Sequence, residues 1–327
     1  MTNINTLFLS AGRRVELVKS FKTAMKEIGI TGSIIAVDLQ KDAPALFFAD
    51  ERLSIRPIKE DGYIDDIIDI CNRKDINLII PTIDTELEIL SKNKNYIEKN
   101  TNAKIMVSDE RVINIIRNKF KTYEFLKSNG FNTPKVITEE DLIDKNYKFP
   151  LFIKPLNGSS SISNFKINNE HELNFLKQYV PNPIIQEFAE GEEYCVDIFT
   201  DFDSNPITIV PKLRTASRTG EISKGKIIKD KNIIELMKRL VDILKPIGEI
   251  NVDCMVSNQG ISIIEINGRF AGGAPMSFKA GANSPLNLYK LIMGEKLEYN
   301  EDYKDEFTVL RFDEAVSIDK SGNVIYY

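Results

Sequence analysis

The stretch NVDCMVSNQGISIIEINGRFAGGAP, residues 251–275, decides which fold this chain adopts. Two runs of alternating residues flank the turn 257–260, whose composition is typical of a β-hairpin. A period of two residues places Glu265 and Asn267 on one face of the second strand, and a hairpin brings that face level with Asp253. Three oxygen-bearing side chains then converge, which predicts a site for a hard divalent cation such as Mg²⁺ that holds substrate phosphates.

The residues that follow this strand are suited to bind an anion. Arg269 lies two residues beyond Asn267 on the same face, and the glycines at 272 and 273 let the backbone approach a ligand closely. The alternative is an edge hairpin whose polar residues are solvated. The apolar residues of the second strand (Ile263, Ile264 and Ile266) instead indicate a buried strand, in which a glutamate needs a partner.

The composition is that of a soluble globular protein, with 42% hydrophobic and 28% charged residues. A chain of 327 residues fits two or three packed domains around a cleft. The net charge of −5 and the pI near 5.3 argue against nucleic acid as the main partner. The apolar run Leu7–Leu9 follows the N-terminus closely, so we expect a first strand there and not a signal peptide. No stretch approaches a membrane span, and no membrane partner is expected.

The histidine and cysteine residues limit the kinds of catalytic and metal sites that we expect. The only histidine, His171, lies in a polar run, which excludes His-based triads and His-rich metal sites. Cys71, Cys195 and Cys254 show no metal or redox spacing, and they indicate a reducing cytoplasm. The sequence contains no Gly-x-x-x-x-Gly-Lys-Ser/Thr phosphate loop. We therefore expect a cytoplasmic protein whose site is built from other residue types.

Strands and helices alternate through the N-terminal third of the chain. Strands are expected at Thr6–Leu9, Ser33–Asp38 and Leu78–Ile80, with helices at Arg13–Ile28 and Tyr63–Arg73. This βαβ order predicts a parallel sheet whose ligand crevice lies at the carboxyl ends of its strands.

The crevice candidates are residues 10–14 (SAGRR), Asp38 and residues 82–86 (TIDTE). A dinucleotide-binding domain with Asp38 on the ribose is the rival interpretation, but the first turn contains only Gly12 and lacks Gly-x-Gly-x-x-Gly. The arginines after that turn fit an anionic group better. The alternative is that Arg13 and Arg14 simply open a solvated helix.

One lysine in the middle of the chain lies in an apolar strand. The strand Phe149–Pro155 carries Lys154, and an interior lysine needs an anion. The loop that follows, residues 157–161 (NGSSS), is rich in backbone N–H and hydroxyl donors that suit phosphates. A snorkelling strand-end lysine and an ordinary connection are the alternatives. Before this strand, a capped helix that contains Lys119 is expected over Ser108–Asn129.

The rest of the chain mixes helices and strands without repeats. Helices are expected over Glu170–Tyr179, Ile233–Leu244 and Leu286–Ile292, strands over Ile184–Phe188, Tyr194–Phe199 and Thr308–Phe312, and a charged loop over Lys212–Lys226.

These pieces, in this order and spacing, resemble the ATP-grasp superfamily, and in particular single-unit proteins related to the carbamoyl-phosphate synthase large subunit. The matching features are Lys119, Lys154 with its Gly/Ser loop, Gln186–Ala189 with Glu193, and Asp253 with Glu265, Asn267 and Arg269. The chain departs from the family pattern at Gln186, often a Glu, and at Gly268, usually a Pro. Residues 10–14 look like the pre-ATP-grasp domain of the same proteins.

The resemblance implies a fold that is α/β and α+β. A Rossmann-like parallel sheet, the pre-ATP-grasp domain, is expected over residues 1–107, and an ATP-grasp domain over residues 108–327. Within the latter, residues 108–187 are the expected first lobe with the phosphate loop, and residues 188–327 the second lobe with the metal site.

The resemblance also implies a role for each matching residue. Lys119 and Lys154 hold ATP phosphates, and the loop residues Gly158, Ser159, Ser160 and Ser161 close over them. Gln186, Glu187, Phe188 and Ala189 read the adenine edge, and Glu193 binds the ribose hydroxyls. Asp253, Glu265 and Asn267 coordinate Mg²⁺, expected as two ions that Mn²⁺ can replace. Arg269 stabilises the transferring charge, and Arg214 and Arg218 lie near the acceptor.

The activity that the resemblance implies is that of an ATP-dependent carboxylate–amine ligase. The carboxylate is first phosphorylated to an acyl phosphate, and an amine or ammonia then displaces phosphate. Small-molecule carboxylate and amine substrates are the expected partners, with an amino acid as the natural class, and a homodimer is left open. We expect no carbamoyl phosphate synthesis, because the chain has one ATP-grasp unit. The alternatives are a carboxylase that uses carboxyphosphate, a non-catalytic ATP-binding regulator and a nicotinamide-dependent oxidoreductase.

Overall fold

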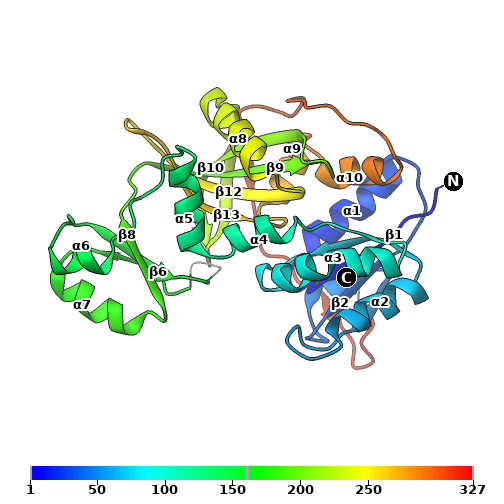
Figure 1. Ribbon diagram of the computed structural model, residues 1–327. Coiled ribbons are helices and arrows are strands. Elements are labelled where there is room, and N and C mark those ends of the chain that lie inside the picture. The colour runs from blue at the N-terminus through cyan, green and yellow to red at the C-terminus, as the bar shows by residue number, and fades with distance from the viewer. Residues whose placement is uncertain (1, 159–161, 326–327) are drawn as a thin grey trace.

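Residues 5–105 form a five-stranded parallel sheet. The computed structural model describes residues 2–158 and 162–325 (Figure 1). The sheet consists of β1 (Asn5–Leu9), β2 (Ile34–Asp38), β3 (Glu51–Ser54), β4 (Ile76–Pro81) and β5 (Lys104–Ile105). Its order is β3-β2-β1-β4-β5, and every neighbouring pair is parallel. The predicted Rossmann-like sheet is therefore confirmed.

Both faces of this sheet are buried, because the central strand is apolar on both sides. Leu7 and Leu9 of β1 belong to the core that includes α2 (Tyr63–Arg73) and α3 (Leu87–Asn100). Phe8 points the other way and meets Phe21 of α1 (Val15–Glu27), with ring centres 5.0 Å apart. The 3₁₀ turns η1 (Pro44–Phe48) and η2 (Asp84–Glu86) lie in the connections.

Two short helices lead out of the N-terminal sheet where one long helix was predicted. They are α4 (Glu110–Ile116) and α5 (Lys119–Ser128). The predicted cap at Ser108 is wrong, because Asp109 accepts the hydrogen bond from the Val112 N–H at 2.9 Å. Asn118 then caps α5 by accepting from two backbone N–H groups, which ends the first helix and places Lys119 at the start of the second.

A small three-stranded lobe projects from the rest of the molecule, at the left of Figure 1. It consists of β6 (Leu151–Pro155), β7 (Phe165–Ile167) and β8 (Pro183–Glu187), in the order β7-β6-β8. The helices α6 (Glu139–Ile143) and α7 (Glu170–Tyr179) belong to this lobe, which has its own apolar core. The strand that carries Lys154 is β6, as predicted.

The C-terminal half is built on a six-stranded antiparallel sheet. Its strands are β9 (Glu192–Thr200), β10 (Pro206–Arg218), β11 (Glu221–Ile227), β12 (Gly248–Ser257), β13 (Gly260–Asn267) and β14 (Phe307–Leu310), in the order β13-β12-β9-β10-β11-β14. The predicted hairpin over residues 251–267 is the pair β12–β13. A further small hairpin, β15 (Ser317–Ile318) with β16 (Val324–Ile325), follows the sheet.

The charged loop predicted over Lys212–Lys226 is wrong, because this segment is the hairpin β10–β11. Its many charged residues conceal the strand pattern. The two turn residues Thr219 and Gly220 both have positive φ, 50° and 78°, as a two-residue hairpin turn requires.

Helices cover both faces of the six-stranded sheet. The apolar side of α8 (Lys231–Leu244) packs against the core that includes Val196, Ile250 and Val252. On the opposite side, α9 (Ala274–Ala280) and α10 (Ser284–Ile292) lie beside α1, which joins the sheet to the N-terminal domain. None of the helices in the described part of the chain is long and apolar enough to cross a membrane.

A β-bulge decides which face the residues of β13 occupy. Asp253 pairs with Glu265, but the next pair is Cys254 with Ile263, so Ile264 has no partner on β12. This extra residue puts Ile263 and Ile266 into the core and keeps Glu265 on the opposite face. β13 is the edge strand of its sheet, yet Ile263 and Ile266 are buried as predicted, whereas Ile264 is half-buried.

Candidate active site

Polar side chains gather on one face of the six-stranded sheet because the strand register places them opposite one another. Asp253 of β12 pairs with Glu265 of β13, and Asn251 pairs with Asn267. On its other side, Asp253 pairs with Cys195 of β9. Directly paired residues project to the same face. The three predicted metal ligands therefore share a face, together with Asn251, which the same period of two would have found.

The carboxylate of Asp253 has an oxygen that no protein group satisfies. Its Oδ1 is buried without a hydrogen-bond partner in the described structure, although the residue as a whole is half-buried. Its pKa is raised to about 6, chiefly by burial, with Glu265 and Glu193 acting in the same direction and Arg214 against it. A buried carboxylate oxygen without a donor is available to a cation.

Two lysines, one at the start of α5 and one on β6, approach these carboxylates. Lys119 Nζ lies 3.1 Å from Glu265 Oε1 and donates a hydrogen bond to the Gly158 carbonyl at 2.7 Å. Lys154 is 3% exposed, and burial lowers its pKa. Lys119 lowers the Lys154 pKa too, whereas Glu265 and Asp253 raise it. The structure thus brings two lysines close to two carboxylates, and each carboxylate lies about 100 residues or more after either lysine in the chain.

The predicted adenine-binding segment connects the three-stranded lobe to the six-stranded sheet. Gln186 pairs with Phe152 of β6, so its side chain is on the same face as Lys154, and it donates to the Pro134 carbonyl at 3.3 Å. The segment then continues through Glu187, Phe188 and Ala189, of which Glu187 is exposed and the other two are half-buried. The predicted loop residues Ser159, Ser160 and Ser161 lie outside the described residues.

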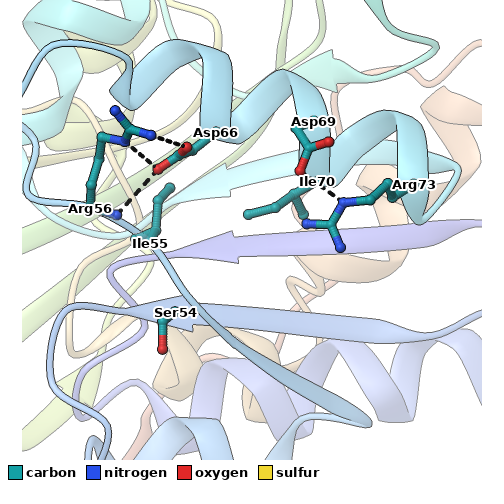
Figure 2. Close-up of a pocket in the computed structure, with 7 residues that line it drawn as sticks. All are labelled: Ser54, Ile55, Arg56, Asp66, Asp69, Ile70 and Arg73. Atoms are coloured by element: carbon teal, nitrogen blue, oxygen red, sulfur yellow. Dashed lines mark hydrogen bonds and ion pairs between the residues drawn. The ribbon is translucent and has the colours of Figure 1, made fainter.

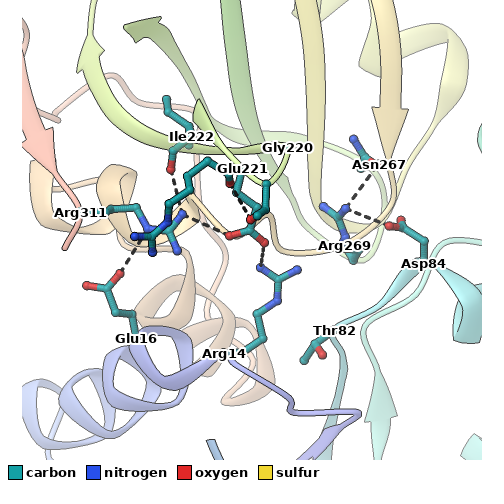
Figure 3. A network of polar contacts seen from close by, with 12 residues as sticks. Arg14, Glu16, Thr82, Asp84, Gly220, Glu221, Ile222, Asn267, Arg269 and Arg311 are labelled. Atoms are coloured by element: carbon teal, nitrogen blue, oxygen red, sulfur yellow. Dashed lines mark hydrogen bonds and ion pairs between the residues drawn. The ribbon is translucent and has the colours of Figure 1, made fainter. Parts of the chain in front are cut away.

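Arg269 links the sheet to the N-terminal domain (Figure 3). Its Nη2 donates to Asp84 Oδ2 at 2.9 Å and to Asn267 Oδ1 at 3.3 Å. Its Nε is buried and has no hydrogen-bond partner in the described part of the chain. Arg269 therefore lies beside a predicted metal ligand and keeps one donor for a further acceptor.

Two more arginines reach the same region, as Figure 3 shows. Arg14 and Arg311 lie on opposite sides of Glu221, with N–O distances of 3.1 and 3.2 Å. The pKa of Arg14 is lowered by burial first and by the positive charges of Arg269 and Arg311 as well, while Glu221 raises it. We call Arg14, Arg269 and Arg311 the arginine cluster. The sequence pointed to Arg14 and Arg269 but missed Arg311 and Glu221, because no local pattern connects such distant segments.

The glycines after Arg269 allow the hairpin β10–β11 to approach the backbone closely. A Cβ on Gly272 would lie 2.2 Å from Glu221 Oε2, and one on Gly273 would lie 2.3 Å from Ile222 Cγ2. Side chains of β11 therefore occupy the space beside both glycines, and the approach of a ligand to this loop stays a prediction.

The two arginines predicted near the acceptor have different surroundings. Arg214 lies in the site: it forms an ion pair with Glu193 at 2.6 Å, donates to the Gly220 carbonyl at 3.1 Å, and acts on the Asp253 pKa. Arg218 is 57% exposed and pairs with Asp313. The structure therefore does not bring Arg218 to the other predicted residues.

A buried ion pair beneath the polar face was missed by sequence reasoning. Lys212 is 0% exposed and pairs with Asp197, which also accepts from Ser277 Oγ at 2.6 Å and from Asn251 Nδ2 at 3.0 Å. Lys212 fell in the segment that was predicted as a loop, so its burial was not anticipated. The pair fixes the Asn251 amide beside Asp253.

The N-terminal crevice has a strained loop at its first turn. Ser10 and Gly12 both have φ of 47°, and the Gly12 N–H donates to Asp38 Oδ2 at 2.8 Å. The other oxygen, Asp38 Oδ1, accepts from the Gln40 N–H at 2.8 Å. Asp38 thus holds this loop, which disfavours its predicted rival role on a nucleotide ribose.

The surface hollow in Figure 2 lies away from this site. It measures about 260 Å³ and is lined by Ser54, Ile55, Arg56, Asp66, Asp69, Ile70 and Arg73. Arg56 forms an ion pair with Asp66 at 2.6 Å, and Arg73 forms one with Asp69 at 2.8 Å. Its charges satisfy one another, so we place the candidate site on the polar sheet face, where buried groups lack partners.

The donor set of the polar face fits Mg²⁺ with nucleotide phosphates. The protein offers carboxylate oxygens of Asp253 and Glu265 and the amide oxygen of Asn267. The described residues contain no group of three or more His, Cys, Asp or Glu side chains that could hold a metal alone. Mg²⁺ is commonly held by one or two carboxylates together with substrate phosphates, and Lys119 and Lys154 lie where such phosphates need cations.

Comparison with known proteins identifies two regions of the chain. Residues 6–106 match the model described as "PylC-like, N-terminal domain", and residues 116–273 match the model described as "ATP-grasp domain". The 3-methyl-D-ornithine–L-lysine ligase of Methanosarcina acetivorans is 24% identical over 298 residues, which span 90% of this chain and 75% of that protein.

Solved structures share the fold over most of this chain. N5-carboxyaminoimidazole synthetase from Staphylococcus aureus, solved with ADP, has a TM-score of 0.70 at 16% identity, covering 91% of this chain and 80% of that one. L-amino acid ligase from Bacillus licheniformis has a TM-score of 0.67 at 16% identity, covering 89% of this chain and 75% of that one. At this identity the likeness establishes the fold.

Proposed function

Since the chain carries an ATP-grasp domain behind a PylC-like N-terminal domain, we propose that it is an ADP-forming ligase that joins a carboxylate to an amine. The observation that carries this proposal is the convergence of Lys119 and Lys154 with Asp253 and Glu265 on the polar sheet face. The two lysines bind and neutralise phosphates, and the two carboxylates hold the Mg²⁺ that accompanies them. The neighbouring arginine cluster supplies positive charge for a carboxylate.

The reaction has two steps. A carboxylate oxygen of the first substrate attacks the γ-phosphorus of ATP, and the bond to the ADP oxygen breaks, which gives an acyl phosphate. The nitrogen of the second substrate then attacks the acyl carbon, loses a proton, and displaces phosphate to leave an amide. Neither step needs a nucleophile from the protein. The chain contributes positioning and charge neutralisation, which agrees with a site of lysines, arginines and carboxylates.

Each cluster has a proposed role in this reaction. Lys119 and Lys154 hold the phosphates, and the segment 186–189 holds the adenine. Asp253, Glu265 and Asn267 hold Mg²⁺, which neutralises phosphate oxygens when it is bound; we propose two ions that Mn²⁺ can replace. Glu193 remains the proposed ribose ligand, although here it pairs with Arg214, and that contact would have to exchange when nucleotide binds.

An amino acid is the proposed carboxylate substrate. The name of the Methanosarcina acetivorans relative describes a ligase that acts on 3-methyl-D-ornithine and L-lysine, two amino acids. We also propose cytoplasmic location and a homodimer as its assembly. The closer resemblance to the carbamoyl-phosphate synthase large subunit stays a prediction, since the relatives reported above are other enzymes of the same fold.

The proposal is tested by phosphate release from Mg-ATP in the presence of pooled amino acids, small acids, ammonia and bicarbonate. At least one amino-acid pool should raise phosphate release by the wild-type protein. Glu265→Gln should abolish the increase and leave the fold intact, because it removes a charge on the metal face. Glu295→Gln, an exposed site remote from that face, is the matched control and should behave as wild type.

Two outcomes would contradict the ligase, and a third would contradict the metal site. An increase only with bicarbonate would indicate a carboxylase. ATP binding without release in any pool would indicate a regulator. Full activity of Glu265→Gln would remove the metal site from the account.

A further inference from the structure

A buried carboxylate lies where the order of the five-stranded sheet reverses. β2 and β3 lie on one side of β1, and the chain then crosses to the other side with β4 and β5. In parallel sheets of this kind, ligands bind outside the carboxyl ends of the two strands at the reversal. Ser10 directly follows β1, and residues 82–86 directly follow β4.

The carboxylate is that of Glu86, which is 0% exposed. Its Oε1 accepts hydrogen bonds from Ser10 Oγ and from Tyr63 Oη, the latter at 2.8 Å. Its Oε2 is buried and has no hydrogen-bond partner in the described structure. Glu86 therefore joins the ends of β1 and β4 with one oxygen and leaves the other unsatisfied.

A purely structural glutamate does not explain this arrangement. Buried polar atoms in folded proteins normally have partners, and an unsatisfied carboxylate oxygen is costly. Burial raises the Glu86 pKa to about 7, and Asp38 acts in the same direction, against the hydrogen bonds from Ser10 and Tyr63. Among the described residues, the nearby arginines have other partners: Arg14 pairs with Glu221, and Arg269 pairs with Asp84.

The surroundings contain charges of both signs. Arg14 lies on the same loop as Ser10, four residues further along the chain. Asp84, two residues before Glu86, holds Arg269 at 2.9 Å. Through Asp84, the segment that carries Glu86 contacts the arginine cluster, which suits a ligand with an ammonium group and a carboxylate.

We infer that Glu86, positioned by Ser10, binds the ammonium group of an amino-acid substrate whose carboxylate lies at the arginine cluster. This inference rests on the proposed ligase function, and it adds the residue that binds the amino group of the proposed amino-acid substrate. The buried Oε2 accepts an N–H of the ammonium group, and Oε1 keeps its bonds to Ser10 and Tyr63.

The test compares amino acids with acids that lack the amino group. The probes are individual L- and D-amino acids, each paired with its desamino acid, such as alanine with propionate and lysine with 6-aminohexanoate. Binding is measured without ATP by thermal shift, and phosphate release is measured with Mg-ATP. The variants are Glu86→Gln, which keeps the Oε1 acceptor, and Ser10→Ala. Glu88→Gln, an exposed glutamate two residues on, is the matched control.

In wild type and Glu88→Gln, an amino acid should bind and be turned over at least about tenfold better than its desamino partner. Glu86→Gln should remove this preference by raising KM for the amino acid, while KM for ATP stays unchanged, and Ser10→Ala should weaken the preference. An unchanged preference in Glu86→Gln, or no amino acid binding to wild type, would overturn the inference. Amino acid binding that depends on Glu86 but never stimulates phosphate release would instead overturn the ligase and leave the amino-acid site at Glu86 standing.

Discussion

Glu86→Gln should make the stability of the ligand-free protein less dependent on pH. The ordinary pKa of a glutamate is 4.5, and in the folded chain burial raises that of Glu86 to about 7. Between these values the folded state binds more protons than the unfolded state, so this carboxyl lowers stability as the pH rises. The cost is absent below about pH 4.5 and complete above about pH 7.

The size of the effect follows from the two pKa values. They differ by about 2.5, and each pH unit corresponds to about 1.4 kcal/mol, so ionised Glu86 costs the folded state on the order of 3 kcal/mol at pH 8. Glutamine removes this cost. It also buries an amide N–H₂ group, but the effect of that neutral group on the free energy of unfolding does not vary with pH. The difference between two pH values therefore isolates the charge.

The assay is urea unfolding at pH 5 and at pH 8. The chain contains 11 Tyr and 0 Trp, so circular dichroism is the suitable signal. Relative to wild type, Glu86→Gln should gain about 2–3 kcal/mol more at pH 8 than at pH 5. Glu88→Gln should show no such difference, because Glu88 is exposed. The same pH dependence in Glu86→Gln and wild type would refute the reasoning that Glu86 is buried without a counter-ion.

Three further substitutions test other parts of the structure. Lys154→Met should lower phosphate release at least about 100-fold with an unchanged circular dichroism spectrum, because it removes a buried ammonium group from the phosphate site; activity near wild type would contradict this role. Lys212→Met should destabilise the protein by about 3–5 kcal/mol in urea unfolding, since it leaves Asp197 buried without its cation, and an unchanged midpoint would count against that pair. Gly268→Ala should cost about 1–3 kcal/mol and lower the Tm, because its Cβ would lie 2.6 Å from Ile116 Cδ1; an equal Tm would mean that this contact relaxes freely.

The hairpin that carries the metal-site residues was predictable because its pattern is local. Glu265 and Asn267 are two residues apart, and a short turn brings Asp253 opposite Glu265. The same rule places Asn251 opposite Asn267 on that face. The bulge at Ile264 was not predictable from alternation, since it changes the phase of the strand by one residue.

Ion pairs between residues that are far apart in the chain could not be predicted from the sequence. Glu221 accepts from Arg14 and Arg311, which are 207 and 90 residues away. Glu86 was part of a predicted crevice segment, but its burial and its contact with Tyr63 required the packed sheet. The charge of Lys212 favoured the prediction of a loop. Only the structure shows that Lys212 is buried in a strand, where it pairs with the carboxylate of Asp197.

The domain order was predictable from motif order alone. The chain presents the ATP-grasp motifs in the expected order, with Lys119 first, Lys154 next and the β12–β13 hairpin last. The family models match residues 6–106 and 116–273. The domain boundaries at 107/108 and 187/188 stay predictions, and so do the individual ligand contacts.

The central claim is that ATP activates a substrate carboxylate by phosphorylation, and transfer of a carboxylate oxygen tests it most directly. Amino acids labelled with ¹⁸O in the carboxylate are incubated with the protein and Mg-ATP, and the released phosphate is examined by mass spectrometry. The account predicts that each turnover places one labelled oxygen in the phosphate, because the acyl carbon loses that oxygen when the amine attacks. Phosphate released at the same rate without label would contradict it.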